Sequence, residues 1–325
     1  MKNTKRYARV IAGFLLLIIA LTSCASDSPT VMKIGKLDVS YDMLRYFARG
    51  YMEGYEDITP EDFLTDSELQ KSLDENVKTS LSELAAYVTL ADKYSIKLDK
   101  DDKAEIDEQM EAMRAEYKDD EAYRSGLDEA NATEAVVRRI YEIQKLCDKL
   151  YEHMTSGNDP YFKSDNATID ADIDAGNWFS AEFILVTYSP GDKESRREYM
   201  EGVIERISKG EELADIYEDD RTIYGLGIQY EKIGGFTYTQ QKEYFEEAVT
   251  ALETGDCSEL IDGPDGFLIV KRLPLDSAYI DKNYVSVFCA GYLEREFFGL
   301  VEETAASLEI KYAKKYEDIK FYEIS

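Results

Sequence analysis

Side chains able to carry out proton transfer or nucleophilic attack are sparse in this chain. Its 325 residues include a single histidine, His153. A serine, histidine and aspartate triad would have to use that imidazole, and the chain has no Gly-x-Ser-x-Gly turn to present a serine. A phosphate-binding Gly-x-x-x-x-Gly-Lys loop and a dinucleotide-binding glycine motif are also absent from the sequence. The sequence therefore gives little support to these enzyme classes.

Acidic residues are abundant, but their spacing does not suit catalysis or a metal site. Asp219 and Asp220 are adjacent, so their side chains point in different directions rather than across a cleft. The run from Asp170 to Gly176, with Glu182, comes nearest to a calcium-binding loop, yet its Gly and Glu each fall one place late. We expect a solvated acidic segment there, with an EF-hand-like site as the alternative. No metal and no cofactor is predicted.

The charge balance restricts the partners. The chain has 38 basic and 67 acidic residues, a net charge of −29 at pH 7. Such a surface repels nucleic acid and anionic lipid headgroups. We therefore expect no nucleic-acid partner, and we expect the field to favour basic or unfolded cationic polypeptides.

The amino-terminal residues 1–24 predict the compartment. A basic start precedes an apolar run from Val10 to Leu21, and Leu21-Thr22-Ser23-Cys24 follows. This pattern is typical of a secretory signal, and its end resembles a bacterial lipobox. The apolar run is short for a membrane span of about 20 residues. We expect Cys24 to be lipidated and the mature chain to be anchored on the extracytoplasmic side; the alternative is a plain signal peptide with a chance cysteine.

The other three cysteines do not indicate redox or metal chemistry. Cys147, Cys257 and Cys289 are odd in number and widely spaced, which fits neither a disulfide framework nor a set of metal ligands. They are expected to be small core residues.

Residues 25–155 are predicted to form a helical domain. A strand-like alternation with a glycine turn spans Val31 to Val39, and Ser40 offers an N-cap oxygen to the next helix. Longer apolar stripes with a 3.6-residue period predict helices at 66–94, 101–117 and 133–154. Amphipathic helices of this kind are stable only when their apolar stripes cover one another.

The remainder of the chain predicts an inserted module and a returning segment. Residues 156–177 lack periodicity and are expected to form a linker. Strand and helix patterns alternate through 178–273, which indicates a compact α/β module. Residues 274–325 predict a helix at about 279–307 and short strands at 308–312 and 319–322, packing back on the amino-terminal helices. The fold class is therefore α+β, with the module inserted in a discontinuous helical domain.

The order of landmarks in the module resembles the parvulin family of peptidyl-prolyl isomerases. The landmarks are an apolar strand at 179–186, a helix ending at Gly210, the pair Gly234-Gly235, an amphipathic run at 244–248 and a closing strand at 266–270. With the lipobox and the helical domain, the layout of the whole mature chain resembles the PrsA/SurA-type extracytoplasmic foldases. The resemblance implies a mainly helical chaperone domain with an inserted isomerase module.

The sequence departs from the parvulin pattern at the positions expected to form the isomerase site. The family's two histidine positions hold Phe183 and Leu268, which offer no hydrogen-bond donor or acceptor on the side chain. Phe245 matches the family's aromatic proline-pocket residue, and Gln241 stands where methionine is frequent. Asp219 and Asp220 are candidates for the acidic position before the glycine pair. The resemblance implies no catalytic residue at these positions. It implies a substrate-binding surface formed by Phe245, Gln241, Phe183, Leu268 and Phe267.

Two functions follow from this combination. The first is a membrane-anchored foldase or chaperone that binds unfolded or proline-containing polypeptides, with isomerase activity weak or lost. Its helical domain would present a cradle lined by Met43, Phe47, Tyr51 and Tyr292. The second is a degenerate, non-catalytic module acting as a structural or adaptor lipoprotein in an envelope assembly. The oligomeric state is left open.

Overall fold

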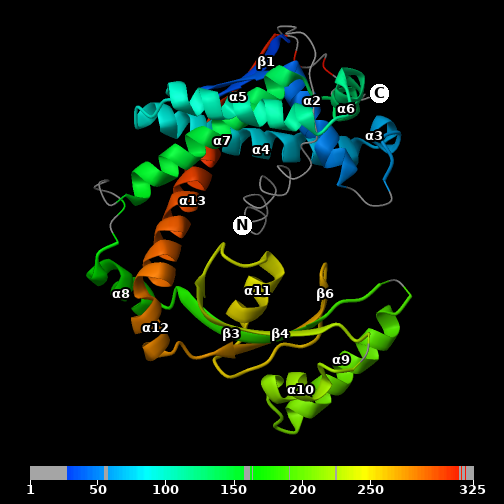
Figure 1. Ribbon diagram of the computed structural model, residues 1–325, viewed down its shortest axis with the longest axis vertical. Coiled ribbons are helices and arrows are strands. Elements are labelled where there is room, and N and C mark those ends of the chain that lie inside the picture. The colour runs from blue at the N-terminus through cyan, green and yellow to red at the C-terminus, as the bar shows by residue number, and fades with distance from the viewer. Residues whose placement is uncertain are drawn as a thin grey trace. The chain divides into compact units, whose positions relative to one another are not determined.

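The computed structural model describes residues 28–54, 58–156, 162, 164–189, 191–223, 225–314, 316 and 319. The chain forms two compact units, one made of residues 1–159 with 297–325 and the other of residues 160–296. The predicted α+β class is confirmed, with a discontinuous helical unit and an inserted sheet module (Figure 1). The signal, the lipobox and Cys24 lie outside the described residues, as does the predicted strand at 319–322 apart from Ile319.

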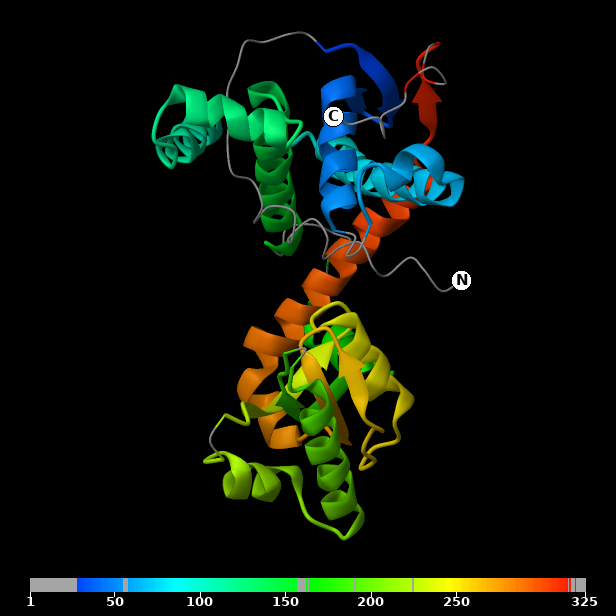
Figure 2. The same ribbon diagram turned by 90° about the vertical axis from the view of Figure 1, so that its right-hand side faces the viewer.

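A small antiparallel sheet joins both ends of the first unit. It contains β1 (Thr30–Ile34), β2 (Leu37–Ser40) and β7 (Ile310–Tyr312), in the order β2-β1-β7. Gly35 turns the hairpin with φ +52°, and a Cβ there would lie 2.6 Å from Thr89 Oγ1. The carboxy-terminal strand thus completes the amino-terminal sheet, as Figure 2 shows beside the blue hairpin.

Helices build the remainder of the first unit. They are α2 (Tyr41–Glu53), α3 (Asp62–Thr65), α4 (Ser67–Lys93), α5 (Lys100–Ala115), α6 (Asp120–Glu129), α7 (Glu134–Thr155) and the end of α13 (Ala290–Ser307). The helices predicted from apolar stripes match α4, α5 and α7. Ser40 Oγ accepts from Met43 N, as expected for an N-cap. The short α6, which buries Tyr123 and Leu127, was not predicted.

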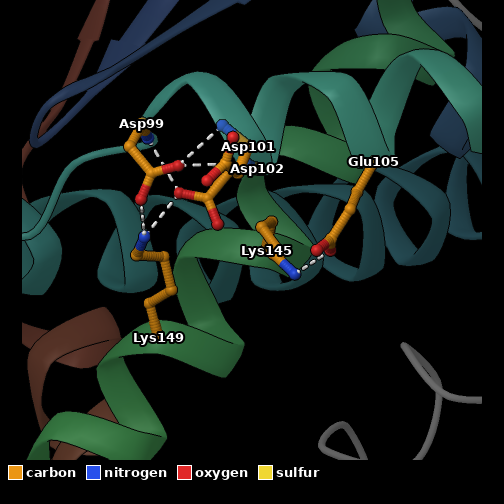
Figure 3. A network of polar contacts seen from close by, with 6 residues as sticks. All are labelled: Asp99, Asp101, Asp102, Glu105, Lys145 and Lys149. Carbon is orange, nitrogen blue, oxygen red and sulfur yellow. Dashed lines mark hydrogen bonds and ion pairs between the residues drawn. The ribbon is translucent and has the colours of Figure 1, made fainter.

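A polar network fixes α5 to α7. Asp99 caps α5, and its backbone N–H donates to the carboxylate of Asp102 in a reciprocal capping box. Lys149 of α7 donates to Asp99 Oδ2 at 2.9 Å and also to Asp102, while Lys145 pairs with Glu105 (Figure 3). The thin apolar stripe of α5 is thereby supplemented by ion pairs.

The second unit is built on a four-stranded antiparallel sheet. Its strands are β3 (Trp178–Val186), β4 (Ile228–Thr237), β5 (Ile261–Gly263) and β6 (Gly266–Leu273), in the order β4-β3-β6-β5. Two helices, α9 (Lys193–Ser208) and α10 (Leu213–Asp220), pack on one face. The helix α11 (Glu243–Ala251) packs on the other face (Figure 1).

The predicted linker at 156–177 contains a helix that the sequence did not indicate. Residues Asn166–Asp174 form a helix, α8, whose first turn is capped by Asp165. Asp172 accepts from Trp178 Nε1 and from Arg295, each at 2.7 Å. The alternative of a calcium-binding loop fails for the same reason, since these carboxylates lie on a helix. A nine-residue helix with few apolar residues leaves little periodicity to detect.

The returning segment also differs from the prediction. Residues from 274 onward were expected to pack on the amino-terminal helices, but only those from Phe297 belong to that unit. The helix α12 (Ser277–Asn283), the π-helix η3 (Tyr284–Cys289) and the start of α13 pack on the sheet module. A Cβ on Gly235 would lie 2.8 Å from Phe288 Cζ, and one on Gly234 would lie closer still to the ring of Tyr279. The glycine pair therefore permits close packing of this segment on β4.

Among the described residues, no helix has the combination of length and apolarity needed to cross a bilayer.

Candidate functional site

Phe267 and Leu268, which were predicted to share one binding surface, point to opposite faces of the sheet because they are neighbours on β6. Successive side chains of a strand point to opposite faces. Leu268 packs on the α11 face with Phe245 and Phe183, whereas Phe267 packs on the α9 and α10 face. The placement of Phe267 in the same binding surface is therefore wrong. Three of the proposed residues, Phe183, Leu268 and Phe245, do come together.

Strand register defines how these residues lie. Phe183 is directly opposite Val270, and Leu268 is opposite Leu185. Phe183 and Leu268 are thus diagonal neighbours on one face, a geometry still within reach of an aromatic ring. On the other side of β3, Glu231 of β4 lies opposite Phe183.

The helix α11 supplies the aromatic centre of this face. The ring of Phe245 contacts the ring of Phe183 at a centroid distance of 5.4 Å and that of Phe236 at 5.7 Å. Phe245 is 6% exposed and Leu268 is 2% exposed, while Phe183 is only partly buried. We refer to Phe183, Phe245, Leu268 and their apolar neighbours Leu185 and Ile261 as the α11 face. It has a covered centre and a partly exposed border.

Polar contacts hold α11 in place. Glu246 accepts from the backbone N–H of Gln241 at 2.7 Å and of Thr239 at 3.1 Å. Asp265, in the β5–β6 turn, accepts from Tyr244 Oη at 2.7 Å and pairs with Lys242. These two partners lower the pKa of the Asp265 carboxyl below its usual range. Gln241 is therefore fixed through the loop preceding the helix.

The titratable candidates are not part of the α11 face. His153 belongs to the other unit, where it is exposed at the end of α7 with its ring 5.8 Å from that of Tyr94. Asp220 of α10 accepts from Tyr199 Oη at 2.7 Å and from Arg206 at 2.6 Å, on the opposite side of the sheet. Asp219, also on α10, pairs with Arg206 as well. Neither aspartate is placed to act at Phe183.

Glu231, the carboxylate next to Phe183, was not predicted from the sequence. This residue is exposed, and its position follows from the antiparallel register of β3 and β4. Counting back by twos from Ile233, which faces α11, gives Glu231 and then Gln229 on the same face. That signal was available only once β4 and its register were known.

Two of the four predicted cradle residues are core residues. Met43 and Phe47 are buried in the core of the first unit. Tyr51 Oη is 2.6 Å from Ser80 Oγ. Tyr292 packs in a cluster of the second unit, around Trp178 and Phe288. Met43 and Phe47 stabilise the fold and do not line a surface.

The chemistry available at the α11 face is apolar contact. The two positions that carry histidine in the resembled family hold side chains that neither donate nor accept a proton. No group of three or more His, Cys, Asp or Glu side chains suited to a metal occurs within the part of the chain that the structure describes. The face can hold an apolar or aromatic group, with Glu231 the carboxylate beside Phe183.

Comparisons with known proteins give alignments in structure only. No family model matches the chain, and no curated protein matches it. Foldase protein PrsA from Streptococcus pneumoniae aligns at 16% identity and a TM-score of 0.35, covering 81% of this chain and 91% of its own. PrsA from Bacillus subtilis aligns at 19% identity and a TM-score of 0.27, covering 74% of this chain and 85% of its own. A SurA-like chaperone from Campylobacter jejuni aligns at 13% identity and a TM-score of 0.26, covering 88% of this chain and 100% of its own. Each of these TM-scores is below 0.5.

Proposed function

We propose that this protein is a membrane-anchored extracytoplasmic foldase or chaperone that holds unfolded or proline-containing polypeptide segments on the α11 face, with isomerase activity weak or lost. The observation that carries the proposal is the position of Phe183. Its ring lies against Phe245 and remains partly exposed, at a position where the resembled parvulins carry a histidine. An aromatic ring there favours binding of apolar groups over polar catalysis.

Holding a non-native chain does not require an imidazole. Apolar contact contributes about 25 cal/mol per Å² removed from water. Leu185 and Ile261, like Phe183, are only partly buried around Leu268 and Phe245. A proline ring or a hydrophobic side chain of a client can remove this border from water, and the covered centre gives it a rigid base.

Efficient isomerisation makes further demands. Rotation about an X-Pro bond crosses a barrier of about 18–20 kcal/mol. Catalysis requires groups that stabilise the twisted amide better than the ground state. Phe183 and Leu268 supply no such polar group, so we expect binding with little rate enhancement.

The location is proposed from the amino-terminal residues alone. The basic start, the apolar run and Cys24 resemble a lipoprotein signal. An acylated Cys24 would hold the protein at the outer side of the membrane, near emerging secreted chains, because each buried methylene contributes about 0.8 kcal/mol.

The test measures aggregation and isomerisation separately. The full chain in neutral detergent micelles is added to a reduced, denatured client, and light scattering is followed, with micelles alone as the control. We expect suppression of scattering at a stoichiometric excess. A coupled assay on Xaa-Pro tetrapeptides should show little acceleration. Unchanged scattering at excess protein would count decisively against the chaperone role.

A second candidate is favoured by the burial of Phe245 and Leu268. With exposed fractions of 6% and 2%, these residues resemble core rather than a pocket. The module would then be a structural or adaptor element of an envelope assembly. Phe245→Ala separates the two: the adaptor function requires lower stability with unchanged peptide affinity, and the binding function requires that affinity fall as well.

A further inference from the structure

The exposed carboxylate of Glu231 stands at the rim of the α11 face. It lies directly opposite Phe183 in the β3–β4 pair, and directly paired residues in antiparallel strands have Cβ atoms about 4.5–5.5 Å apart. β4 is an edge strand of the sheet. A polypeptide segment resting on the ring of Phe183 therefore brings its neighbouring side chains within reach of Glu231.

Three other charged groups near this face have partners of their own. Arg272 donates to the carbonyl oxygen of Leu252 at 2.7 Å, and its guanidinium lies over the ring of Phe179. Lys242 pairs with Asp265, and Glu246 accepts from two backbone N–H groups. Within the described residues, the carboxylate of Glu231 forms no hydrogen bond or ion pair. It is thus a solvated negative charge next to an aromatic surface.

We propose that Glu231 selects client segments in which a lysine or arginine directly neighbours the proline or apolar residue held against Phe183. The inference rests on the proposed function, because it presumes that the α11 face binds polypeptide. The occupant is an extended, unfolded segment with an apolar residue and an adjacent cation. An exposed ion pair of this kind corresponds to a preference of about 2- to 5-fold in affinity.

The net charge of the chain makes a control necessary. A charge of −29 attracts any cationic peptide at low salt. A local contact with Glu231 must therefore be separated from this general attraction. Glu201, which is exposed on α9 and so lies on the helix layer of the opposite sheet face, provides the matched position. Glu201→Gln removes the same charge from the same unit.

The experiment compares three labelled peptides that differ at one residue. Fluorescein-Gly-Gly-Ala-Lys-Pro-Phe-amide and its Gln and Glu counterparts are titrated with the full chain in neutral detergent micelles, and anisotropy gives each Kd. We expect the Lys peptide to bind about 2- to 5-fold more tightly than the Gln peptide, and the Glu peptide to bind most weakly. Glu231→Gln should remove the preference for Lys over Gln, Glu231→Lys should reverse the order, and Glu201→Gln should leave it unchanged.

The possible results distinguish failure of the proposed selectivity from failure of the proposed function. Equal affinity for the three peptides would overturn the selectivity and leave the proposed function standing. A Lys preference that Glu231→Gln and Glu201→Gln reduce equally would assign it to the net charge and overturn the role of Glu231. Absence of binding by all three peptides would reject the proposed function and the selectivity together. Circular dichroism of each variant confirms that the fold is retained.

Discussion

The ring of Phe183 meets the ring of Phe245 at a centroid distance of 5.4 Å, with the two planes 75° apart. This edge-to-face contact joins the central strand β3 to α11, and pairs of this geometry contribute about 0.5–1.5 kcal/mol beyond their burial. Phe236 adds a second contact to Phe245 on the side of β4. Phe183 thus has a structural role in joining β3 to α11.

Truncation of the central ring should cost stability. Phe245→Ala removes a buried ring from between β3, β4 and α11, so the free energy of unfolding of the module should fall by about 3–5 kcal/mol. Urea denaturation followed by circular dichroism measures the change. Ile223→Ala provides the control, since Ile223 is half exposed and should change the value by less than about 0.5 kcal/mol. Equal losses for both variants would contradict the central place of Phe245.

Histidine should be tolerated unequally at positions 183 and 268. Phe183 is partly exposed, whereas Leu268 is buried at 2%. Leu268→His should therefore destabilise by about 2–4 kcal/mol, and Phe183→His by less.

The pH dependence provides a second readout. Burial lowers the pKa of a histidine below its usual value of about 6.5. The stability of Leu268→His should therefore fall further as the pH falls from 7 to 5, because the unfolded chain gains a proton that the folded site rejects. A flat profile, or a larger loss for Phe183→His, would contradict the assigned burial.

The elements that could be predicted from the sequence are those stabilised by residues within or next to the element itself. Leu73, Val77 and Leu81 recur at helical spacing and are fully buried on α4. Ser40 lies just before its helix and caps it as expected. The apolar strand at 179–186 was likewise evident, because a central strand covered on both faces is apolar almost throughout.

The apolar composition of strands covered on both faces also explains why the facing of their side chains could not be predicted. An apolar run such as Phe267, Leu268 and Ile269 carries no alternation, so only the register with β3 shows which side chain faces α11. Asp172 of α8 accepts from Trp178, six residues further along the chain, and from Arg295, which is 123 residues away and could not be paired with it from the sequence. The change of unit at Phe297 falls within a continuous helix, α13, so no loop marks it.

The capping network of α5 should make the stability of the protein depend on pH below about pH 4. The backbone N–H of Asp102 and the ammonium of Lys149 lower the pKa of the Asp99 carboxyl to about 2. A depressed carboxyl pKa gives stability that is present above the unfolded value of about 3.9 and is lost as the pH falls towards the folded value. The urea midpoint of the wild type should therefore fall between pH 4 and pH 2.

Lys149→Met tests the contribution of the ammonium. This variant removes the contacts to both Asp99 and Asp102 (Figure 3). Its midpoint should be lower at pH 6 and should change less steeply below pH 4. Lys71→Met is the matched control, since Lys71 and Glu75 form an exposed pair at 3.9 Å. Identical profiles for the two lysine variants would contradict the network.

Glu83 should make the first unit less stable as the pH rises towards neutrality. Burial, together with the charge of Glu302 on α13, raises the pKa of Glu83 to about 7, and its Oε2 is buried without a hydrogen-bond partner. The unfolded chain ionises this group at about 4.3. Between these values the folded state retains a proton that the unfolded state has lost, so stability falls as the pH rises from about 4.5 to 7 and then levels off.

Glu83→Gln replaces the ionisable group by a neutral one of similar size. We expect the variant to gain about 1–2 kcal/mol at pH 8 relative to wild type and to show no gain at pH 4.5, where wild-type Glu83 is already protonated in the folded protein. Urea denaturation at the two pH values measures the difference. Glu108→Gln on the exposed side of α5 is the control. A gain of the same size at both pH values would show that Glu83 is not protonated in the fold, and its placement against Glu302 would then have to be revised.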